Sequence, residues 1–299
     1  MARFGHRQLE YFIAVANAGS FRRAAEALYI SQPSLSTQIG AMERELGAAL
    51  FYRHARGVNL TPVGRVLLRE ALTTVAAADR AYRLARLAAD GSTGDLKFAT
   101  ITSIAAGLVP RALERWRINR PGALVSMTEF RNPIALEQSV RDGQFDFAIG
   151  PKPGTTFAYM QSLGAEEFVV LLPREDPLLK EKQVSLAMLS KRRWVLFTPD
   201  NGIFRVHESI FARENLIIEG AAFTSQTDAA VNLAAAGLGP TIVPSNAVPE
   251  HLKPNLRPFH NRYLREVFAY APDSLDPFSG SFVTELGTVV AEDATVGAD

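Results

Sequence analysis

The sequence of 299 residues contains no cysteine, and this absence excludes several kinds of chemistry. Without a thiol the chain forms no disulfide, holds no thiolate-bound metal and has no cysteine nucleophile. Its five histidines, at positions 6, 54, 207, 251 and 260, show no spacing typical of metal ligands. The P-loop, the complete GxGxxG motif and the G-x-S-x-G nucleophile motif are also missing. We therefore expect neither enzyme activity nor a cofactor.

Long apolar segments are lacking as well. No apolar run reaches the roughly 20 residues of a membrane-spanning helix. The opening stretch MARFGHRQLEYF lacks the apolar core of a signal peptide. Hydrophobic residues make up 47% of the chain and charged residues 21%, which is ordinary for a globular protein. These features predict a cytoplasmic protein of two or three domains with no membrane partner.

Lysine is absent from the first 96 residues, although arginine is frequent there. Residues 1–89 hold 12 arginines and 6 acidic residues, a charge of 12 − 6 = +6, whereas residues 90–299 hold 20 basic and 25 acidic residues, or −5. The planar guanidinium of arginine suits phosphate and guanine better than the lysine ammonium does. This asymmetry is typical of a polyanion-binding N-terminal module, but an ordinary scatter of charge would also produce it.

Capping signals divide the N-terminal region into short helices. A helix over 6–18 is followed by Ser20, which we expect to cap a second helix that ends near Leu28. Ser31 is the next expected N-cap, and Gly47 the residue that ends the third helix. Two short helices joined by a turn of three or four residues form a helix-turn-helix unit.

The third helix has two different sides. Its apolar residues Leu35, Ile39, Met42 and Leu46 recur at spacings of four, three and four, and should face the core. Its opposite side begins with small polar residues and a proline, where a solvent-exposed helix usually carries Lys and Glu. Small side chains let a helix enter a major groove about 12 Å wide and exchange hydrogen bonds with base edges. The expected DNA-reading residues are Ser31, Gln32, Pro33, Ser34, Ser36 and Thr37.

A two-stranded wing is expected after the third helix. Residues 50–52 and 58–60 are typical of short strands, and Arg56 lies at the expected hairpin tip. A wing in this position would place Arg53 and Arg56 beside the phosphate backbone or the minor groove. We expect the second helix to hold phosphates as well, through Arg22 or Arg23.

A long helix over 62–89 follows the Thr61-Pro62 start signal. Two seven-residue series alternate along it, as in a coiled-coil seam. Such a seam either lies on its own domain or pairs with a second copy of the chain, and its alanine content favours pairing. The two series are Leu68, Val75, Tyr82 and Ala89, and Gly64, Ala71, Ala78 and Ala85.

The stretch DGSTG at 90–94 has the composition of a hinge, and the pattern then changes to alternating strands and helices. This alternation predicts an α/β body of about 200 residues, divided into two lobes. The expected strands are 95–101, 123–130, 145–150, 167–173, 193–199, 221–225, 239–244 and 266–272. The expected helices are 103–119, one ending at 140, 203–214, 228–236 and 277–291.

Residues 6–64 resemble the LysR-type transcriptional regulators. The family patterns L-x-x-F and A-x-x-G-S-F-x-x-A-A-x-x-L match Leu9–Phe12 and Ala16–Leu28. Two further patterns, S-Q-P-S-[LV]-S-x-Q-I-x-x-L-E-x-x-L-G and L-F-x-R-x-x-R-x-[VL]-x-L-T-x-A-G, match Ser31–Gly47 and Leu50–Gly64. The departures are Met42 for leucine, Val63 for alanine, and Thr37 where arginine or a larger base-reading residue is frequent, which leaves the bases read there open.

The resemblance implies an architecture and a set of partners. It implies an all-α winged helix-turn-helix over 1–64, a dimerising linker helix and hinge over 65–94, and a two-lobed α/β effector domain over 95–299 similar to periplasmic binding proteins. Lobe one would comprise about 95–164 and 267–292, and lobe two about 165–266. The implied partners are promoter DNA, a small-molecule effector, RNA polymerase, and further copies of the chain in a homodimer or a dimer of dimers.

The resemblance also implies an effector cleft between the lobes, at strand ends and helix N-termini. Hydroxyl groups and helix termini of this kind suit a carboxylate, so we expect a small anionic organic effector. Ordinary helix capping is the competing explanation for each hydroxyl, and a surface or hinge ion pair is the competing one for Arg131. The expected cleft residues are Thr100, Thr102, Ser103, Thr128, Arg131, Asn201, Gly202, Phe204 and Thr227.

Two other classes of protein share parts of this pattern. Residues 95–290 are typical of an exported solute-binding or receptor protein, but that protein would need a signal segment. The second alternative is a ligand-independent architectural DNA binder. A metabolite should stabilise an effector-driven regulator against heat, whereas an architectural protein should respond to DNA alone.

Overall fold

The computed structural model describes residues 4–54, 57–90 and 94–296. The chain divides into two compact units, residues 1–91 with 141–144 and residues 92–140 with 145–299. The long helix falls in the first unit, whereas the separate linker segment over 65–94 stays a prediction.

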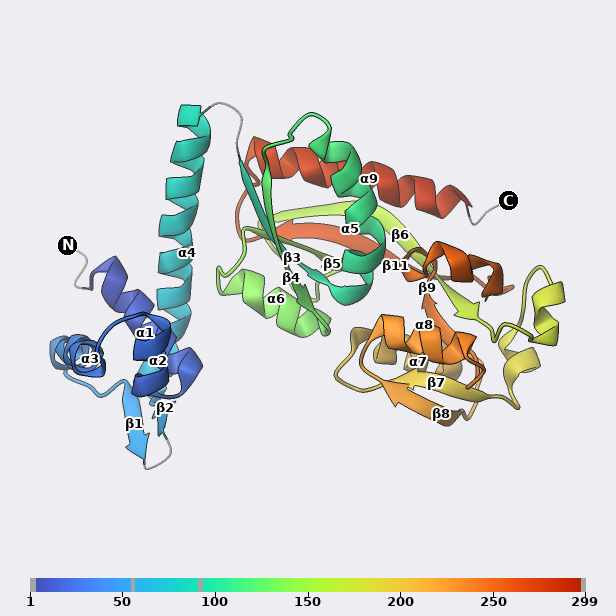
Figure 1. The fold of residues 1–299 in the computed structure, drawn as a ribbon, viewed down its shortest axis with the longest axis horizontal. Coiled ribbons are helices and arrows are strands. Elements are labelled where there is room, and N and C mark those ends of the chain that lie inside the picture. The colour runs from blue at the N-terminus through green and yellow to red at the C-terminus, as the bar shows by residue number, and fades with distance from the viewer. Residues whose placement is uncertain (1–3, 55–56, 91–93, 297–299) are drawn as a thin grey trace. The chain divides into compact units, whose positions relative to one another are not determined.

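The first unit is a winged helix-turn-helix, as predicted (Figure 1). Three helices precede a two-stranded antiparallel hairpin, and the long helix follows it. The elements are α1 (His6–Ala18), α2 (Phe21–Ala27), α3 (Gln32–Leu46), β1 (Phe51–His54), β2 (Gly57–Leu60) and α4 (Pro62–Asp90).

The predicted caps of α2 and α3 are confirmed. Ser20 Oγ accepts a hydrogen bond from the Arg23 amide at 3.4 Å, and Ser31 Oγ accepts one from the Ser34 amide at 3.3 Å. Helix α3 ends at Gly47, whose φ of +67° is a conformation that glycine adopts without strain. The turn between α2 and α3 contains Tyr29, which has a φ of +55° and a 96% exposed side chain.

The apolar side of α3 forms most of the small core of this unit. Leu35, Ile39 and Met42 are fully buried, together with Phe12 of α1. The prediction for Leu46 was wrong, because this residue is 41% exposed. It is the last residue of α3, one turn beyond Met42, and neither α1 nor α2 covers it there.

The first half of α4 also packs on this core. Ala71 is buried, and Leu68 and Val75 contact the same cluster of apolar side chains. Gly64 lies so close to the residue before β1 that a Cβ atom at this position would be 2.2 Å from the Leu50 carbonyl oxygen. The predicted pairing seam therefore does not extend over the whole helix, because its first half is already covered; Tyr82 remains 67% exposed.

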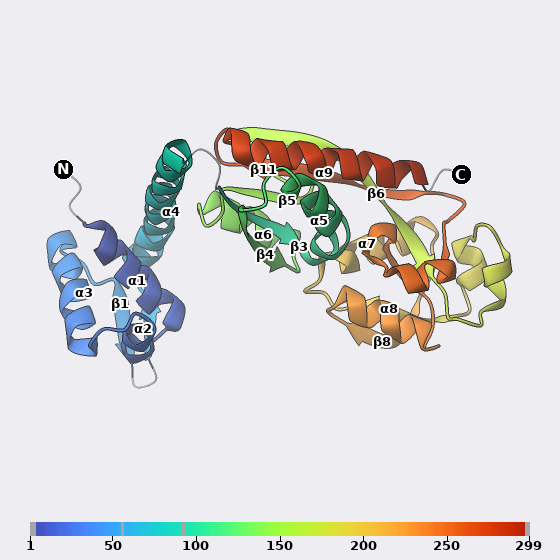
Figure 2. The same ribbon diagram turned by 45° about the horizontal axis from the view of Figure 1, so that its top comes forward.

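The second unit contains a seven-stranded sheet with the order β10-β6-β11-β5-β3-β4, and β9 also pairs with β6. Strands β3, β4 and β5 are parallel, and helices α5 and α6 cross between them. Figures 1 and 2 show α5 and α9 packed together over the sheet, whereas α6 lies on its other side in Figure 1. These elements form lobe one: β3 (Asp95–Ile101), α5 (Thr102–Arg117), β4 (Leu124–Phe130), α6 (Pro133–Arg141), β5 (Phe147–Pro151) and α9 (Pro277–Val296).

Lobe two contains a separate parallel pair of strands, β7 and β8, beside the ends of the large sheet. It also contains helices α7 and α8 and short 3₁₀ helices. The elements are η1 (Pro177–Lys180), η2 (Leu186–Leu189), β7 (Arg193–Phe197), α7 (Gly202–Arg213), β8 (Glu219–Thr224), α8 (Thr227–Ala235), β9 (Thr241–Pro244), η3 (Ser245–Ala247), η4 (Glu250–Asn255) and β10 (Leu256–Arg257).

Two long strands, β6 (Tyr159–Leu171) and β11 (Tyr263–Ala271), connect the lobes (Figure 1). Ala165 and Glu266, where the lobes were expected to meet, are paired opposite each other. The sequence pattern placed the start of β6 at 167, which was wrong, because the strand begins at Tyr159. Its first half mixes apolar residues with Gln161, Ser162 and Gly164 and lacks the β-branched run of its second half, so it depends on pairing with β11 rather than on its own strand propensity.

Each lobe has its own apolar core. Phe98, Phe147 and Phe282 lie at the centre of lobe one, and Trp194 and Phe197 at the centre of lobe two. The two connecting strands carry charged residues between these cores. In the part of the chain that the structure describes, no helix is long and apolar enough to cross a lipid bilayer.

Candidate DNA-binding surface and ligand cleft

The first turn of α3 is exposed, and its side chains form few hydrogen bonds within the unit. Gln32, Pro33, Ser34 and Thr37 are exposed, and Ser36 is half-buried. The Thr37 hydroxyl donates to the Pro33 carbonyl at 2.9 Å, and the Ser31 hydroxyl caps the helix. The side chains of Gln32, Ser34 and Ser36 form no hydrogen bond with any other described residue. Those three side chains are therefore available for hydrogen bonds to a binding partner.

The expected phosphate-binding arginines have different surroundings. Arg22 forms an exposed ion pair with Glu26 at 3.2 Å within α2. Arg23 donates to the carbonyl of Ala18, so it also holds the end of α1. The guanidinium of Arg53 lies 4.8 Å from the centre of the Phe21 ring and remains exposed. Arg56 lies outside the described residues, so its role stays a prediction.

Six of the predicted effector residues lie together between the two lobes of the second unit. They line a narrow cavity of about 10 Å³, room for about one water molecule. A second cavity, of about 190 Å³, shares Thr102 and Thr227 with it and is also lined by Gln226 and by the acidic residues Glu129 and Asp228. The six residues are Thr102, Ser103, Arg131, Asn201, Gly202 and Thr227.

Three other predicted residues line neither cavity. Thr100 is fully buried within β3, and its hydroxyl has no hydrogen-bond partner. Thr128 is exposed on β4, and Phe204 packs against the core of lobe two. Alternation along a strand explains the first two positions, since consecutive side chains point to opposite faces of the sheet.

The lobes touch directly across the narrow cavity. The Gly202 amide donates to the Arg131 carbonyl at 2.7 Å, and the Arg131 side chain pairs with Asp200 at 3.5 Å. A hydrogen bond from Thr198, together with the Arg131 charge, lowers the pKa of Asp200 below its usual value. Arg131 is thus a partner in an exposed ion pair between the lobes, where both side chains are at least half exposed.

Capping explains only one of the three helix starts at this cleft. Asn201 caps α7, because its side chain accepts a hydrogen bond from the Ile203 amide at 2.8 Å. Helices α5 and α8 begin without a side-chain cap. The hydroxyl of Thr227, on the first turn of α8, is buried and has no partner. Two helix N-termini and a free hydroxyl therefore face the same space.

Arg265 on β11 is a cleft residue that the sequence did not point out. It lines the narrow cavity, and its Nη2 donates to the Ser103 hydroxyl at 3.0 Å. Its Nε donates to the buried carboxylate of Glu166 at 2.7 Å. The sequence signal was a lone arginine in the otherwise strand-like stretch LREVFAYA, which predicts a strand but gives no hint of the neighbouring helix.

One further buried polar group, His207, belongs to the core of lobe two. His207 is buried between Phe197 and Phe211, and its Nε2 lies 2.8 Å from the Ile242 carbonyl oxygen. Burial lowers the pKa of His207 to about 4, so the ring is neutral at pH 7. No group of three metal-binding side chains occurs within the described ranges.

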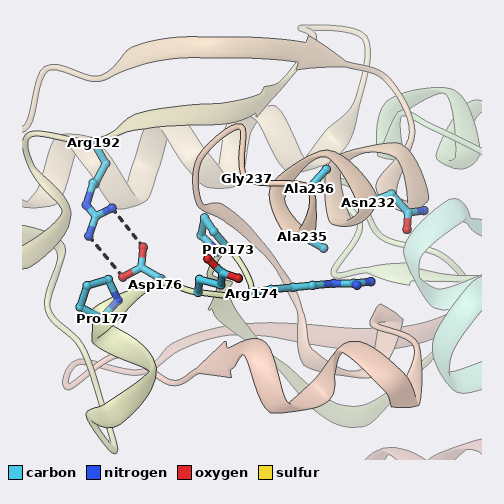
Figure 3. Close-up of a pocket in the computed structure, with 10 residues that line it drawn as sticks. Pro173, Arg174, Asp176, Pro177, Arg192, Asn232, Ala235, Ala236 and Gly237 are labelled. Atoms are coloured by element: carbon cyan, nitrogen blue, oxygen red, sulfur yellow. Dashed lines mark hydrogen bonds and ion pairs between the residues drawn. The ribbon is translucent and has the colours of Figure 1, made fainter.

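A larger cavity, of about 700 Å³, lies elsewhere in lobe two (Figure 3). It is bounded by residues 173–177 and by the C-terminal end of α8. Its buried carboxylate, Asp176, already pairs with Arg192 at 3.1 Å and caps η1 through the Leu178 amide at 3.0 Å. The exposed Arg174 also lines this cavity, which therefore offers one guanidinium beside the Asp176–Arg192 pair and the carbonyl end of α8; none of the predicted effector residues lines it.

Two family models match the chain. Residues 6–65 match the bacterial regulatory helix-turn-helix protein model of the lysR family, and residues 89–287 match the LysR substrate binding domain. The chain belongs to the LysR family of transcriptional regulators. The second match covers more than half of the sequence, so this assignment does not depend on the helix-turn-helix alone.

Relatives and solved structures agree with this assignment. The chain is 32% identical to the Hca operon transcriptional activator HcaR of Escherichia coli over 242 residues, 80% of this chain and 81% of the relative. It is 33% identical to the transcriptional regulator BudR of Raoultella terrigena, covering 80% and 84%. The crystal structure of CbnR, a LysR family regulator, has a TM-score of 0.72 at 23% identity and covers 96% of this chain and 99% of that one.

These findings define the class of this LysR family member. It is a DNA-binding transcriptional regulator with an effector-binding domain, and not an enzyme. CbnR has also been solved in complex with its target DNA, and that structure has a TM-score of 0.70 at 24% identity, covering 96% of this chain and 100% of CbnR.

Proposed function

We propose that this regulator reads promoter DNA with the first turn of α3 and responds to a small anionic organic effector bound between its lobes. The observation that carries the effector proposal is the meeting of α5 and α8, both without a side-chain cap, at a cavity that contains the unpartnered hydroxyl of Thr227. The first-turn amides and the positive ends of both helices favour a negative charge there.

The DNA proposal rests on the start of α3, where the side chains are mostly exposed and form few hydrogen bonds within the unit. Gln32, Ser34 and Ser36 have side chains that can bond to base edges, and Pro33 has an apolar ring that can contact a thymine methyl. Arg53 and Arg56 in the wing, with Arg22 or Arg23 on α2, would hold phosphates. A dimer or a dimer of dimers would place two such helices on inverted half-sites.

The size of the cleft limits the effector. The cavity of about 190 Å³ is smaller than the roughly 300–1,000 Å³ typical of sites for drug-sized ligands. The direct contact between Gly202 and Arg131 also holds the lobes closed. We infer a small organic acid, and a response that changes the assembly on DNA and the recruitment of RNA polymerase in the cytoplasm.

Footprinting on the DNA upstream of its own gene tests both parts. We expect a protected region with two-fold symmetry, and a shift in its extent when an effective small acid is added. Replacing Arg56 with alanine should weaken binding to every site to a similar degree and reduce the salt slope by about one unit. Absence of binding to any duplex at low salt would refute the DNA proposal, and a footprint that no acid changes would refute the effector proposal.

A further inference from the structure

The strands that join the two lobes carry a buried ion pair at the point where they leave lobe one. Arg265 on β11 lies directly opposite Glu166 on β6, one residue beyond the Ala165–Glu266 pair. Glu166 is only 1% exposed, and the side chain of Arg265 is 11% exposed. Removing both charges from water is costly, so a pair in this position needs a reason beyond stability.

The contacts of this pair reach both lobes. Arg265 bonds to Glu166 and to Ser103, the second residue of α5 in lobe one. The other oxygen of Glu166 accepts a hydrogen bond from the Asn246 side chain at 3.1 Å, and Asn246 lies on η3 of lobe two. The face of the guanidinium also lies 4.9 Å from the Phe168 ring. A change at Arg265 therefore affects groups in both lobes.

Arg265 still has capacity for another partner. Within the described part of the chain, no acceptor lies within hydrogen-bond distance of its Nη1. The Ser103 hydroxyl accepts from Arg265, and its own proton has no acceptor there. Across the narrow cavity lies the unpartnered hydroxyl of Thr227.

We propose that Arg265 is the residue that binds the effector's carboxylate, and that Glu166 occupies its charge until the effector arrives. The inference rests on the function proposed above. The carboxylate would accept hydrogen bonds from Arg265, Ser103 and Thr227, and would draw the guanidinium away from Glu166. Glu166 is then a positioning residue, which holds Arg265 at the cavity edge and competes with the effector for it.

The test measures how much an acid stabilises the full-length chain against heat, compared with its neutral amide. The probes are acetate, succinate and benzoate, each beside the corresponding amide. We expect at least one acid to stabilise the wild type more than its amide does. Arg265→Met should weaken that acid about 10- to 100-fold, because a charge-assisted hydrogen bond is lost, and Arg265→Lys should weaken it less.

Glu166→Gln should lower the stability of the free chain but raise its affinity for the acid. The variant should be less stable without ligand, because Arg265 loses its counter-ion, yet bind the acid roughly tenfold more tightly because the competitor is gone. Arg262→Met is the matched control. Arg262 pairs with Glu167 at 2.7 Å on the same two chain segments, but neither residue lines the cleft, so acid binding should stay within about twofold of wild type.

Several outcomes would overturn this proposal. It is wrong if none of the acids stabilises the wild type more than its amide, if Arg265→Met binds the acid as tightly as wild type, or if Glu166→Gln binds it more weakly. The second outcome would leave an effector site at another place in the cleft, so the proposed function would stand. A chain that ignores promoter DNA but shows the expected acid series would refute the proposed function and leave Arg265 as an acid-binding residue.

Discussion

Replacing Gly202 with alanine should open the contact between the lobes. A Cβ atom at this position would lie 2.7 Å from Cδ of Pro133 and 3.4 Å from the carbonyl oxygen of Arg131. Contacts under 3.0 Å require one of the groups to move, and Pro133 is a ring held at the start of α6. The lobes therefore separate at this point, because no flexible side chain is present that could yield.

The size of the effect follows from the cost of overpacking, about 1–3 kcal/mol. If this cost falls on the closed form alone, the equilibrium between closed and open forms shifts by about 5- to 150-fold. The amide of residue 202 reports the shift directly, because in the wild type it donates to the Arg131 carbonyl at 2.7 Å. Its hydrogen exchange should accelerate by the same factor.

Gly280→Ala is the matched control for this measurement. Gly280 also lies in the first turns of a helix, α9, but an added Cβ would meet nothing within 4 Å. That substitution should stabilise the chain by about 0.5–1 kcal/mol through helix propensity and leave exchange at residue 202 unchanged. If the Gly202→Ala variant keeps wild-type protection at residue 202, the lobes tolerate the extra methyl group and the reasoning about closure is refuted.

Three further predictions concern stability and DNA binding. As the pH falls from 6.5 to 4 the wild type should lose about 3 kcal/mol, since the unfolded chain binds a proton that buried His207, with a pKa of about 4, does not; denaturant titrations of His207→Gln should lack this slope. Gly64→Ala should cost the first unit more than about 3 kcal/mol, because its Cβ would meet the Leu50 carbonyl, whereas Gly40→Ala, with open space around it, should not destabilise; calorimetry distinguishes them. Ser31→Ala should cost about 1 kcal/mol through the lost cap and weaken DNA binding at every salt concentration, measured by fluorescence anisotropy.

The helix-turn-helix could be predicted nearly residue by residue because its signals are local. Ser20, Ser31 and Gly47 cap or end helices through bonds to neighbouring residues, so the sequence alone places them. The prediction that Leu46 faces the core was wrong for a tertiary reason. Periodicity assigns a side chain to one face of a helix, but only packing decides how far along that face the core extends. The same limit applies to α4, where Ala71 fits a pairing seam and is instead buried in its own unit.

Some cleft residues could likewise be named from the sequence, and others could not. Thr102, Ser103 and Thr227 could be named from sequence, because a hydroxyl at the start of a helix that follows a strand is a local pattern. Thr100 and Thr128 could not be separated from them, since which face of the sheet adjoins the cleft depends on the strand order. Only the tertiary structure shows that α5 and α8 lack side-chain caps at the same cavity.

The sequence by itself therefore determined the class of this protein and most of its helices and strands, because caps, turns and periodicities act over a few residues. It also predicted the surface offered to DNA, which stays a proposal. The tertiary structure decided which polar groups meet between the lobes. Arg265 and Glu166 are 99 residues apart in the chain and come together only through the register of β6 and β11. No short turn joins these two strands, so turn geometry does not fix that register, and it depends on which of their side chains the folded sheet buries.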